Sequence, residues 1–285
     1  MAVVGAVIVT FQSARTIGDC LRSLRSATTS NTLRVIVLDN ASNDGSSGVA
    51  RATDGEAVVV GREANDGYAV ACNDGLARLG DDVDWVLFAN PDTTWPAGSL
   101  DALVAAAAGN PSAGLVSPVL IDTGGNTQPI VERDLTLGRV LRGMVRIGRP
   151  VRPVVPPAAG PPVAVEWVHT AAALMPLDVA RRLDGFDPRF FLFAEDADLC
   201  RRVRSAGLSV LVVPEVRVAH ERGASVDAAT DSGGAAALRV RAVATYLDKY
   251  EGARARRVFG ALGALVYRLA GHGAQASAAW AEARR

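Results

Sequence analysis

Residues 85–92 read Trp-Val-Leu-Phe-Ala-Asn-Pro-Asp, an apolar run that ends in an amide and a carboxylate. A short, continuous apolar run is typical of a strand in a sheet that is covered on both faces. Far downstream, residues 190–200 read Phe-Phe-Leu-Phe-Ala-Glu-Asp-Ala-Asp-Leu-Cys, with an acidic cluster where a helix is expected to begin. Carboxylates in these two places suit a metal-assisted transfer from a phosphate-bearing donor, with a separate carboxylate as base.

Strand-like and helix-like segments alternate over the first 120 residues. We expect strands at Val3–Val9, Leu33–Leu38, Ala57–Val60, Trp85–Ala89 and Gly114–Leu120. Apolar residues at helical spacing lie between them, in Ala14–Ser26, Gly67–Leu79 and Ala97–Ala108. Repeated alternation of strand and helix predicts an α/β fold with a doubly wound, mainly parallel sheet.

The pattern changes in the second half of the chain. Residues 122–162 are punctuated by proline and glycine and are only weakly periodic, so we expect a long loop or lid there. Order resumes near residue 163, with helices predicted at about 176–184 and 195–206 and strands at 208–213 and 216–219. Residues 226–285 are rich in alanine and arginine and are predicted to be helical.

The composition excludes some classes of protein. The 285 residues carry 30 basic and 30 acidic side chains, and this formal charge of zero argues against a general nucleic-acid binder. Cys20, Cys72 and Cys200 lie far apart and fit buried thiols of a reducing compartment better than disulfides or a zinc site. Ala2–Val9 lacks the basic leader and cleavage-like site of a signal peptide, and no apolar run reaches about 18 residues. We therefore expect a cytoplasmic protein.

Polar side chains stand where four of the predicted strands end. These positions are Thr10-Phe11, Asp39-Asn40, Asn90-Pro91-Asp92 and His220. In open α/β sheets, ligands bind in the crevice beyond the carboxyl ends of the strands, so one shared site is expected. Taken alone, residues 39–46 read as a turn or helix cap, and residues 65–75 as a tight turn followed by a helix.

In this order, the motifs resemble those of the inverting, nucleotide-sugar-dependent glycosyltransferases of family 2, especially their rhamnosyltransferase-like members. The matching segments, all within residues 3–225, are Thr10-Phe11-Gln12, Asp39-Asn40-Ala41-Ser42, Asn65-Asp66-Gly67-Tyr68, Asn90-Pro91-Asp92, Gly185–Arg202 and His220. The resemblance implies the GT-A fold over residues 1–225. It implies a nucleotide-binding part (about 1–121), a lid or acceptor loop (about 122–162) and an acceptor and catalytic part (about 163–225), followed by a helical C-terminal extension (226–285).

On the donor side, the resemblance implies that Asp39 accepts a hydrogen bond from a pyrimidine N3–H. Asp92 would be a direct ligand of a divalent cation, Mn²⁺ or Mg²⁺, that neutralises the departing diphosphate. His220 would complete the ligand set and favour Mn²⁺, with a purely structural histidine as the alternative. Nucleotide or donor contacts are further implied for Thr10, Phe11, Asn40, Asn65, Gly67, Asn73 and Asn90.

On the acceptor side, the resemblance implies that Asp196 is the base. It would take the proton of the acceptor hydroxyl while that oxygen attacks the anomeric carbon from the face opposite the leaving group. Glu195 would orient the site, and Asp198 would anchor the helix or contact the acceptor. His169 and Thr170 are assigned to contacts with sugar or acceptor, and a partly buried structural role is the alternative for His169. An acidic helix N-terminus, which the helix dipole favours, explains one or two of these acids but not the whole string.

The predicted activity is metal-dependent transfer of a sugar, with rhamnose from dTDP-rhamnose favoured, to a glycan acceptor that is polyprenyl-diphosphate-linked or part of the cell envelope. The alternatives are a UDP-galactofuranose or UDP-N-acetylglucosamine donor, a nucleotidyltransferase of related fold, and a catalytically silent glycan-binding or scaffold subunit. The chain departs from the family pattern at Gln12, Thr170 and Ala194, where Asn, Gly and a bulkier residue are usual.

The arginines of residues 254–257 precede an apolar, helix-like segment. They predict either a helix docked on the core or an interfacial helix attracted to anionic lipid at the membrane surface. The sequence makes no prediction of oligomeric state.

Overall fold

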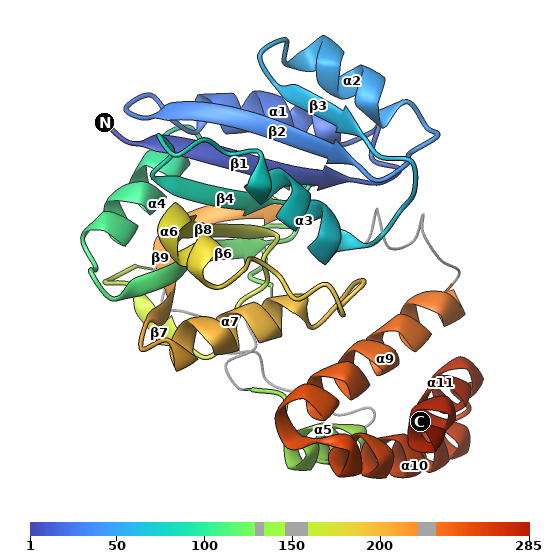
Figure 1. Cartoon of the computed structure of the whole chain (residues 1–285). Helices are drawn as coiled ribbons and strands as arrows, with labels where there is room; N and C mark the ends of the chain where they lie inside the picture. The colour runs from blue at the N-terminus through green and yellow to red at the C-terminus, as the bar shows by residue number, and fades with distance from the viewer. Residues whose placement is uncertain (129–133, 146–158, 222–231) are drawn as a thin grey trace.

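The computed structural model describes residues 1–128, 134–145, 159–221 and 232–285, and Figure 1 shows how they are arranged. The strands are β1 Val3–Thr10, β2 Thr32–Asp39, β3 Val58–Gly61, β4 Trp85–Ala89, β5 Thr93–Thr94, β6 Ala113–Ile121, β7 Val163–Val165, β8 Ala172–Pro176 and β9 Ser209–His220. The helices are α1 Ile17–Ser26, α2 Ser46–Thr53, α3 Tyr68–Ala77, α4 Ser99–Ala108, α5 Leu137–Val145, α6 Leu177–Arg182, α7 Glu195–Ser205, α9 Ser232–Glu251, α10 Ala253–Leu269 and α11 Gly273–Arg284.

These strands form one mixed sheet in the order β3-β2-β1-β4-β8-β6-β9-β5, with β7 also paired to β9. β1 lies parallel to β2 and to β4, β2 to β3, and β6 to β9. β8 runs antiparallel between β4 and β6, and β5 and β7 run antiparallel to β9. The predicted α/β fold with a mainly parallel sheet is confirmed.

Some local features differ from the expectation. The strands predicted at 208–213 and 216–219 form one strand, β9, because residues 214–216 fall in a register irregularity between the pairs Pro118–Val213 and Val119–Arg217. The short elements α2, α5, β5 and β7 were not predicted, and α5 lies inside the expected loop 122–162. Residues 129–133 and 146–158 of that loop, and the expected boundary near residue 225, lie outside the described residues.

Two apolar clusters cover the two faces of the sheet. Along β1, Val4, Ala6 and Ile8 pack into one cluster and Val7 and Val9 into the other, because side chains alternate between the faces of a strand. Helices α1, α2 and α4 contribute to the first cluster, and α3, α6 and α7 to the second. The three cysteines are buried and free, as predicted.

The C-terminal helices form a layer beside the sheet domain, at the bottom of Figure 1. α9, α10 and α11 pack on one another and on α5 around Val240, Leu247 and Phe259. α9 also meets α7 and the loop before it, where Phe190 and Tyr246 are buried in a further cluster. Within the described part of the chain, none of the helices combines the length and the apolar character that crossing a bilayer requires.

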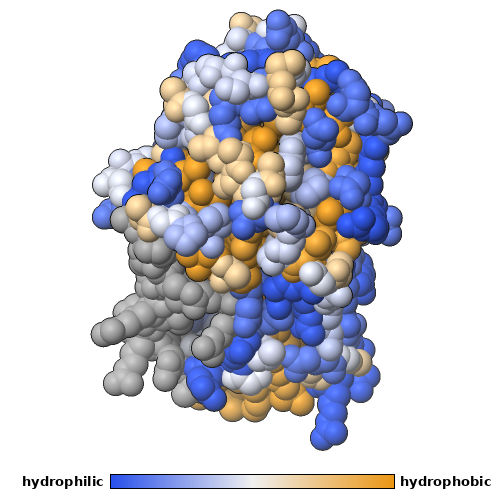
Figure 2. Space-filling view, turned by 90° about the vertical axis from the view of Figure 1, so that its left-hand side faces the viewer, coloured by the Kyte–Doolittle hydropathy of each residue, from blue (hydrophilic) through white to orange (hydrophobic). Residues whose placement is uncertain are grey.

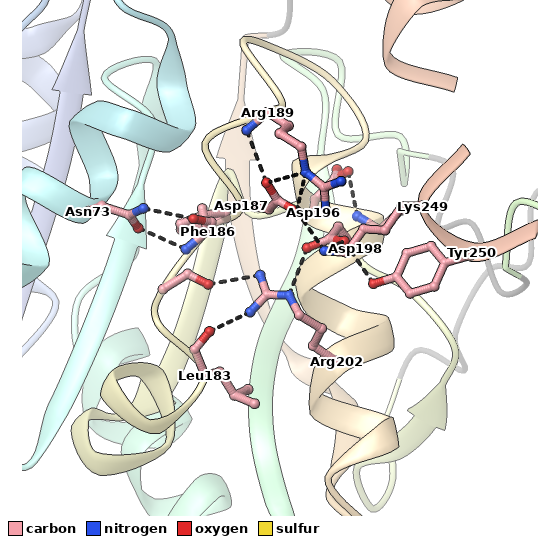
Figure 3. A network of polar contacts seen from close by, with 12 residues as sticks. Asn73, Leu183, Phe186, Asp187, Arg189, Asp196, Asp198, Arg202, Lys249 and Tyr250 are labelled. Carbon is pink, nitrogen blue, oxygen red and sulfur yellow. Dashed lines mark hydrogen bonds and ion pairs between the residues drawn. The ribbon is translucent and has the colours of Figure 1, made fainter. Parts of the chain in front are cut away.

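A buried carboxylate network fastens α9 to α7 (Figure 3). Asp198, in the first turn of α7, is fully buried. Its Oδ2 accepts a hydrogen bond from Nε of Arg202 at 2.7 Å, and its Oδ1 accepts from Lys249 Nζ and, at 2.8 Å, from the Tyr250 hydroxyl. Lys249 also donates to Asp187 at 2.7 Å. A buried carboxylate costs several kcal/mol unless charges and donors satisfy it, so these contacts hold α7 and α9 in one geometry.

Removing the cation of this network should destabilise the protein. We expect Lys249→Met to lower the free energy of unfolding by about 3 kcal/mol or more, because it leaves a buried carboxylate short of its partner. Urea unfolding measures the change. The control Arg34→Met breaks a half-exposed pair with Asp82 and should cost less than about 1 kcal/mol. Equally small losses in both variants would contradict the anchoring role.

Candidate active site

A cavity of about 670 Å³ lies beyond the carboxyl ends of β1 and β4 and extends to the beginning of α7 and to α9. It brings together most of the predicted site residues: Phe11, Asn40, Asn65, Gly67, Asn90, Asp92, His169, Thr170, Glu195, Asp196 and His220. Asp92 and Asp196, from distant parts of the sequence, therefore face one shared space. Thr10, Asp39, Asn73 and Asp198 do not line it.

Asp92 and His220 form the first group of the cavity. Asp92 follows β4, and His220 ends β9, where it pairs with Thr93 of β5. Both side chains are buried, and Nε2 of His220 lies 3.4 Å from Oδ1 of Asp92. That oxygen accepts no hydrogen bond, and Nδ2 of Asn90 lies 3.2 Å from the same imidazole nitrogen.

Gln128 fixes the orientation of His220. Its Nε2 donates to the carbonyl oxygens of His220 at 2.6 Å and of Ile121 at 3.3 Å, so its Oε1 is the atom that faces Nδ1 of His220 at 3.0 Å. Nδ1 must then carry the proton, and Nε2 is left with a lone pair. That lone pair accepts a hydrogen bond from Nδ2 of Asn90, and the unpartnered Oδ1 of Asp92 lies 3.4 Å from the same nitrogen. A cation bound by His220 and Asp92 would give Oδ1 the partner that it lacks.

These residues fit a divalent cation that is partly held by the substrate. Among the residues that the structure describes, no group of three or more His, Cys, Asp or Glu side chains forms a ready-made metal site. One carboxylate, one imidazole and the Asn90 amide stand together instead. Mg²⁺ and Mn²⁺ are commonly held by one or two carboxylates, with phosphate oxygens and water supplying the remaining ligands.

Asp196 and His169 form the second group. Asp196 lies in the first turn of α7, where its Oδ1 accepts a hydrogen bond from the amide of Ala197 at 2.8 Å. Its Oδ2 lies 2.9 Å from Nδ1 of His169, which donates to it when Asp196 is ionised. The amide and the imidazole therefore fix the carboxylate of Asp196 at the cavity wall.

Glu195 stands beside Asp196 in the same acidic turn and is buried. Burial raises the pKa of Glu195 well above its usual range, and the charge of Asp196 raises it further. Oε2 of Glu195 has no hydrogen-bond partner. The raised pKa favours the protonated form of Glu195, so Asp196 is the carboxylate of this pair that is better placed to accept a proton.

The turn before α7 is strained. Phe193 and Ala194 have φ values of 71° and 61°, a left-handed backbone that costs non-glycine residues of the order of 1 kcal/mol each. The loop is held by the start of α3, where the amide of Tyr68 donates to the carbonyl oxygen of Phe191 at 2.8 Å. A Cβ on Gly67 would stand 2.4 Å from that oxygen, so only glycine permits this approach.

The donor-side residues divide into two groups. Asn40 and Asn65 line the cavity, and Oδ1 of Asn40 is buried without a partner. Thr10 and Asp39 are paired at the ends of β1 and β2, and the carboxylate of Asp39 accepts hydrogen bonds from the amide of Ser42 at 3.0 Å and from the Ser47 hydroxyl. Asp39 therefore lies beside the cavity and already has protein partners.

Two predicted contacts are corrected by the structure. The amide of Asn73 donates to the carbonyl oxygen of Phe186 at 2.7 Å and accepts from its N–H at 2.8 Å, so this side chain clamps α3 to the loop and does not face the donor space. Asp198 is enclosed by the network of Figure 3 and cannot contact an acceptor, whereas the anchoring role that we also expected for it agrees with its contacts.

Sequence reasoning missed four residues of this region: Tyr68, Gln128, Trp167 and Arg239. Tyr68 stands inside a recognised motif, and its hydroxyl donates to the carbonyl oxygen of Thr170 at 3.3 Å. Gln128 and Trp167 lie in weakly patterned sequence, and Arg239 is one arginine of an arginine-rich helix. No local signal distinguishes these three from surface residues.

Comparison with known sequences gives matches over most of the chain. Residues 6–155 match the family model "Glycosyl transferase family 2", and residues 157–241 match "Glycosyltransferase like family 2". The N-acetylglucosaminyl-diphospho-decaprenol L-rhamnosyltransferase of Mycobacterium tuberculosis is 31% identical over 243 residues, which cover 78% of this chain and 77% of the relative. The pre-mycofactocin glycosyltransferase of the same organism is 29% identical over 194 residues, 66% of this chain and 37% of the relative.

Solved structures with the same fold include two glycosyltransferases. The mannosyltransferase PcManGT of Pyrobaculum calidifontis, in complex with GDP-Man and Mn²⁺, superposes with a TM-score of 0.62 at 18% identity and covers 99% of this chain and 86% of its own. S. aureus TarS 1-349 in complex with UDP-GlcNAc has a TM-score of 0.57 at 14% identity, with coverages of 94% and 73%. At these identities, the likeness establishes the GT-A fold.

The raised pKa of Glu195 predicts a pH-dependent stability. A raised pKa means that the native state keeps this proton after the unfolded chain has lost it, so the stabilising contribution is complete below the ordinary value of 4.5 and is lost as the pH rises through the native value. Glu195→Gln keeps a neutral side chain at every pH. The unfolding free energy of Glu195→Gln, relative to that of wild type, should therefore increase as the pH rises above 4.5, by up to about 1.4 kcal/mol per pH unit.

Urea unfolding of both proteins between pH 4 and 8 measures this difference. The control is Glu56→Gln, which changes an exposed glutamate. The difference in unfolding free energy between this variant and wild type should not grow above pH 4.5. A constant difference between wild type and Glu195→Gln across that range would show that Glu195 is ionised in the native state.

Proposed function

This chain belongs to glycosyltransferase family 2, and from that premise we propose that it transfers rhamnose from dTDP-rhamnose to a polyprenyl-diphosphate-linked glycan, with inversion at the anomeric carbon. The observation that carries the proposal is the cavity shared by Asp92 and Asp196. A transfer needs an electrophilic site for the leaving diphosphate and a base for the acceptor within reach of one sugar. The curated relative, whose name specifies rhamnose and a decaprenol-linked acceptor, supports both the donor and the acceptor.

Asp196 acts as the base. As the acceptor oxygen bonds to the anomeric carbon, its proton passes to Oδ2 of Asp196, and the bond from that carbon to the diphosphate oxygen breaks. His169 donates its Nδ1–H to Asp196 and so positions the carboxylate. The raised pKa of Glu195 favours its protonated form, so we assign the new proton to Asp196. The displacement forms no covalent intermediate on the protein.

The residues around Asp92 serve the leaving group. Asp92, His220 and Asn90 would hold a divalent cation, and Gln128 keeps the lone pair of His220 directed toward it. When bound, such a cation neutralises the charge that develops on the departing nucleoside diphosphate. The buried and unpartnered Oδ1 of Asp92 supports this assignment. The imidazole ligand favours Mn²⁺ over Mg²⁺.

Transfer assays with dTDP-rhamnose, an N-acetylglucosaminyl-diphospho-prenol acceptor and Mn²⁺ test this mechanism. We expect Asp196→Asn to reduce the turnover at least 100-fold because the base is lost, and Glu195→Gln to keep it within tenfold because glutamine keeps the neutral form that the raised pKa of Glu195 favours. Chelation should abolish transfer, and added Mn²⁺ should restore it. Asp92→Asn should weaken the Mn²⁺-dependent thermal stabilisation by dTDP.

The outcomes separate the parts of this proposal. Turnover with UDP-galactofuranose or UDP-N-acetylglucosamine but not with dTDP-rhamnose would refute the donor and leave the catalytic roles intact. Full activity of Asp196→Asn would refute the base. Tighter binding of GDP than of dTDP or UDP would contradict a pyrimidine contact at Asp39.

The outer face of the C-terminal helices supports an additional proposal, that the protein binds the membrane surface. Leu262, Leu265 and Leu269 lie on one face of α10 and are 45%, 56% and 80% exposed. Trp280 of α11 is also exposed, and Arg254, Arg257 and Arg268 are exposed arginines of α10. Figure 2 shows apolar atoms along the lower end of the molecule, where these helices lie. Apolar side chains flanked by arginines are typical of interfacial helices.

Vesicle binding tests this surface. We expect wild type to co-sediment with vesicles that contain anionic phosphatidylglycerol and to release as salt rises, because each arginine contributes about 1 kcal/mol near an anionic surface. The double variant Leu265→Glu/Leu269→Glu should bind at least tenfold more weakly. Val58→Glu, which changes an exposed apolar residue of β3, serves as the matched control and should bind as wild type. If wild type does not bind these vesicles, the membrane proposal is contradicted, and the alternative that α10 only docks on the core is favoured.

A further inference from the structure

α9 of the C-terminal extension supplies one wall of the cavity. Arg239, Ala242 and Val243 of this helix line the same space as the two catalytic groups. Ala242 and, one turn further along the helix, Tyr246 are also buried in a cluster with Phe190 and Ala197, which lie before and at the start of α7. Because Lys249 and Tyr250 also bind the buried Asp198, the position of Arg239 is set by the same contacts that hold the catalytic helix (Figure 3).

The two ends of the cavity differ in polarity. Near the strand ends the lining is polar, with Asn40, Asn65, Asn90, Asp92 and His220. Beside α9 it is apolar, and its residues are Leu135, Trp167, Phe193, Ala242 and Val243. An apolar wall gains free energy when it removes a hydrocarbon from water, and a nucleotide sugar has no such group.

Arg239 is the basic residue among the described residues that line the cavity, which otherwise carry the carboxylates of Asp92, Glu195 and Asp196. Its guanidinium lies 4.5 Å from the centroid of the Phe193 ring. Within the described part of the chain, no carboxylate lies within ion-pair distance of it. Arg239 is therefore an exposed cation without an ion-pair partner among the described residues, at the boundary between the cavity and an apolar wall.

We propose that Arg239 binds the diphosphate of the lipid-linked acceptor and that the apolar wall beside it receives the first isoprene units of the prenyl chain. The inference rests on the proposed function and adds a subsite to it. An Arg–phosphate contact supplies the charge that the diphosphate requires, and an adjoining hydrocarbon wall distinguishes a prenyl diphosphate from the equally anionic donor. The acceptor sugar, attached to the other end of the diphosphate, then extends toward Asp196.

Steady-state kinetics of Arg239→Gln, Arg239→Lys and the control Arg241→Gln test the subsite. Arg241 is an exposed residue of the same helix that does not line the cavity. With a farnesyl-diphosphate-linked N-acetylglucosamine acceptor, we expect Arg239→Gln to raise the KM for the acceptor about tenfold or more and to change the KM for the donor less than twofold. Arg239→Lys should recover part of the loss, because it keeps the charge but not the bidentate geometry. Arg241→Gln should match wild type.

Two further measurements separate the source of the anion and the role of the wall. Binding is measured by calorimetry with farnesyl diphosphate alone, with dTDP, and with inorganic diphosphate. We expect Arg239→Gln to weaken the binding of farnesyl diphosphate about tenfold and to leave the binding of dTDP unchanged. Val243→Asn should remove most of the preference of wild type for farnesyl diphosphate over inorganic diphosphate.

The outcomes distinguish this subsite from the proposed function. A rise in the donor KM, or weaker dTDP binding, in Arg239→Gln would overturn the subsite and assign the guanidinium to the donor. Equal binding of farnesyl diphosphate by wild type and Arg239→Gln would also overturn it. If wild type transfers no sugar to any prenyl diphosphate acceptor, the proposed function fails, and the farnesyl diphosphate titration still decides the subsite.

Discussion

The buried carboxylate of Asp198 is the contact on which the arrangement of the site depends. It lies in the first turn of α7, beside the residues that face the cavity, and its cations come from α7 itself and from the last turn of α9. A buried charge is tolerated only where its partners are held in place, so the contact is far more restrictive than apolar packing alone. It ties two distant segments of the sequence into one wall of the cavity, and the C-terminal helices therefore belong to the site.

Three acids share the first turn of α7, and each avoids the repulsion of the others in a different way. In Glu195, burial and then the neighbouring charge of Asp196 raise the pKa and so disfavour the ionised form. The carboxylate of Asp196 accepts hydrogen bonds from the amide of Ala197 and from the imidazole of His169. The carboxylate of Asp198 accepts hydrogen bonds from Arg202, Lys249 and Tyr250. The three acids of this turn thus differ in their surroundings, and Asp196 is the one for which we propose the role of base.

The fold was predictable to a large extent because burial on both faces of a parallel sheet leaves continuous apolar runs, such as Trp85–Ala89, that end in polar residues. Phe11, Asn40, Asp92 and His220 meet in one cavity, as the strand-end argument predicts, and Asp196 joins them from the start of α7. The antiparallel direction of β8 was not predictable, because apolar content does not encode strand direction. Gln128 and Arg239 show the limit for side chains: an amide that orients an imidazole and a cation on a cavity wall have the same sequence signature as surface residues. Asn73 was singled out, but its sequence does not reveal that this amide clamps a loop.

The proposed subsite gives the C-terminal extension a physical connection between lipid and catalysis. Arg239 lines the cavity, and α9 continues from it to Glu251, a rise of about 18 Å along the helix. The exposed leucines of α10 begin eleven residues beyond Glu251. A prenyl chain embedded in a bilayer at α10 and bound by its diphosphate at Arg239 would have to leave the lipid between these two helices. Since α9 is fixed to α7 through Asp198, a protein docked on the bilayer would hold Asp196 at a constant height above the lipid. A membrane-bound acceptor of the corresponding length would then reach the base without any movement of the sheet.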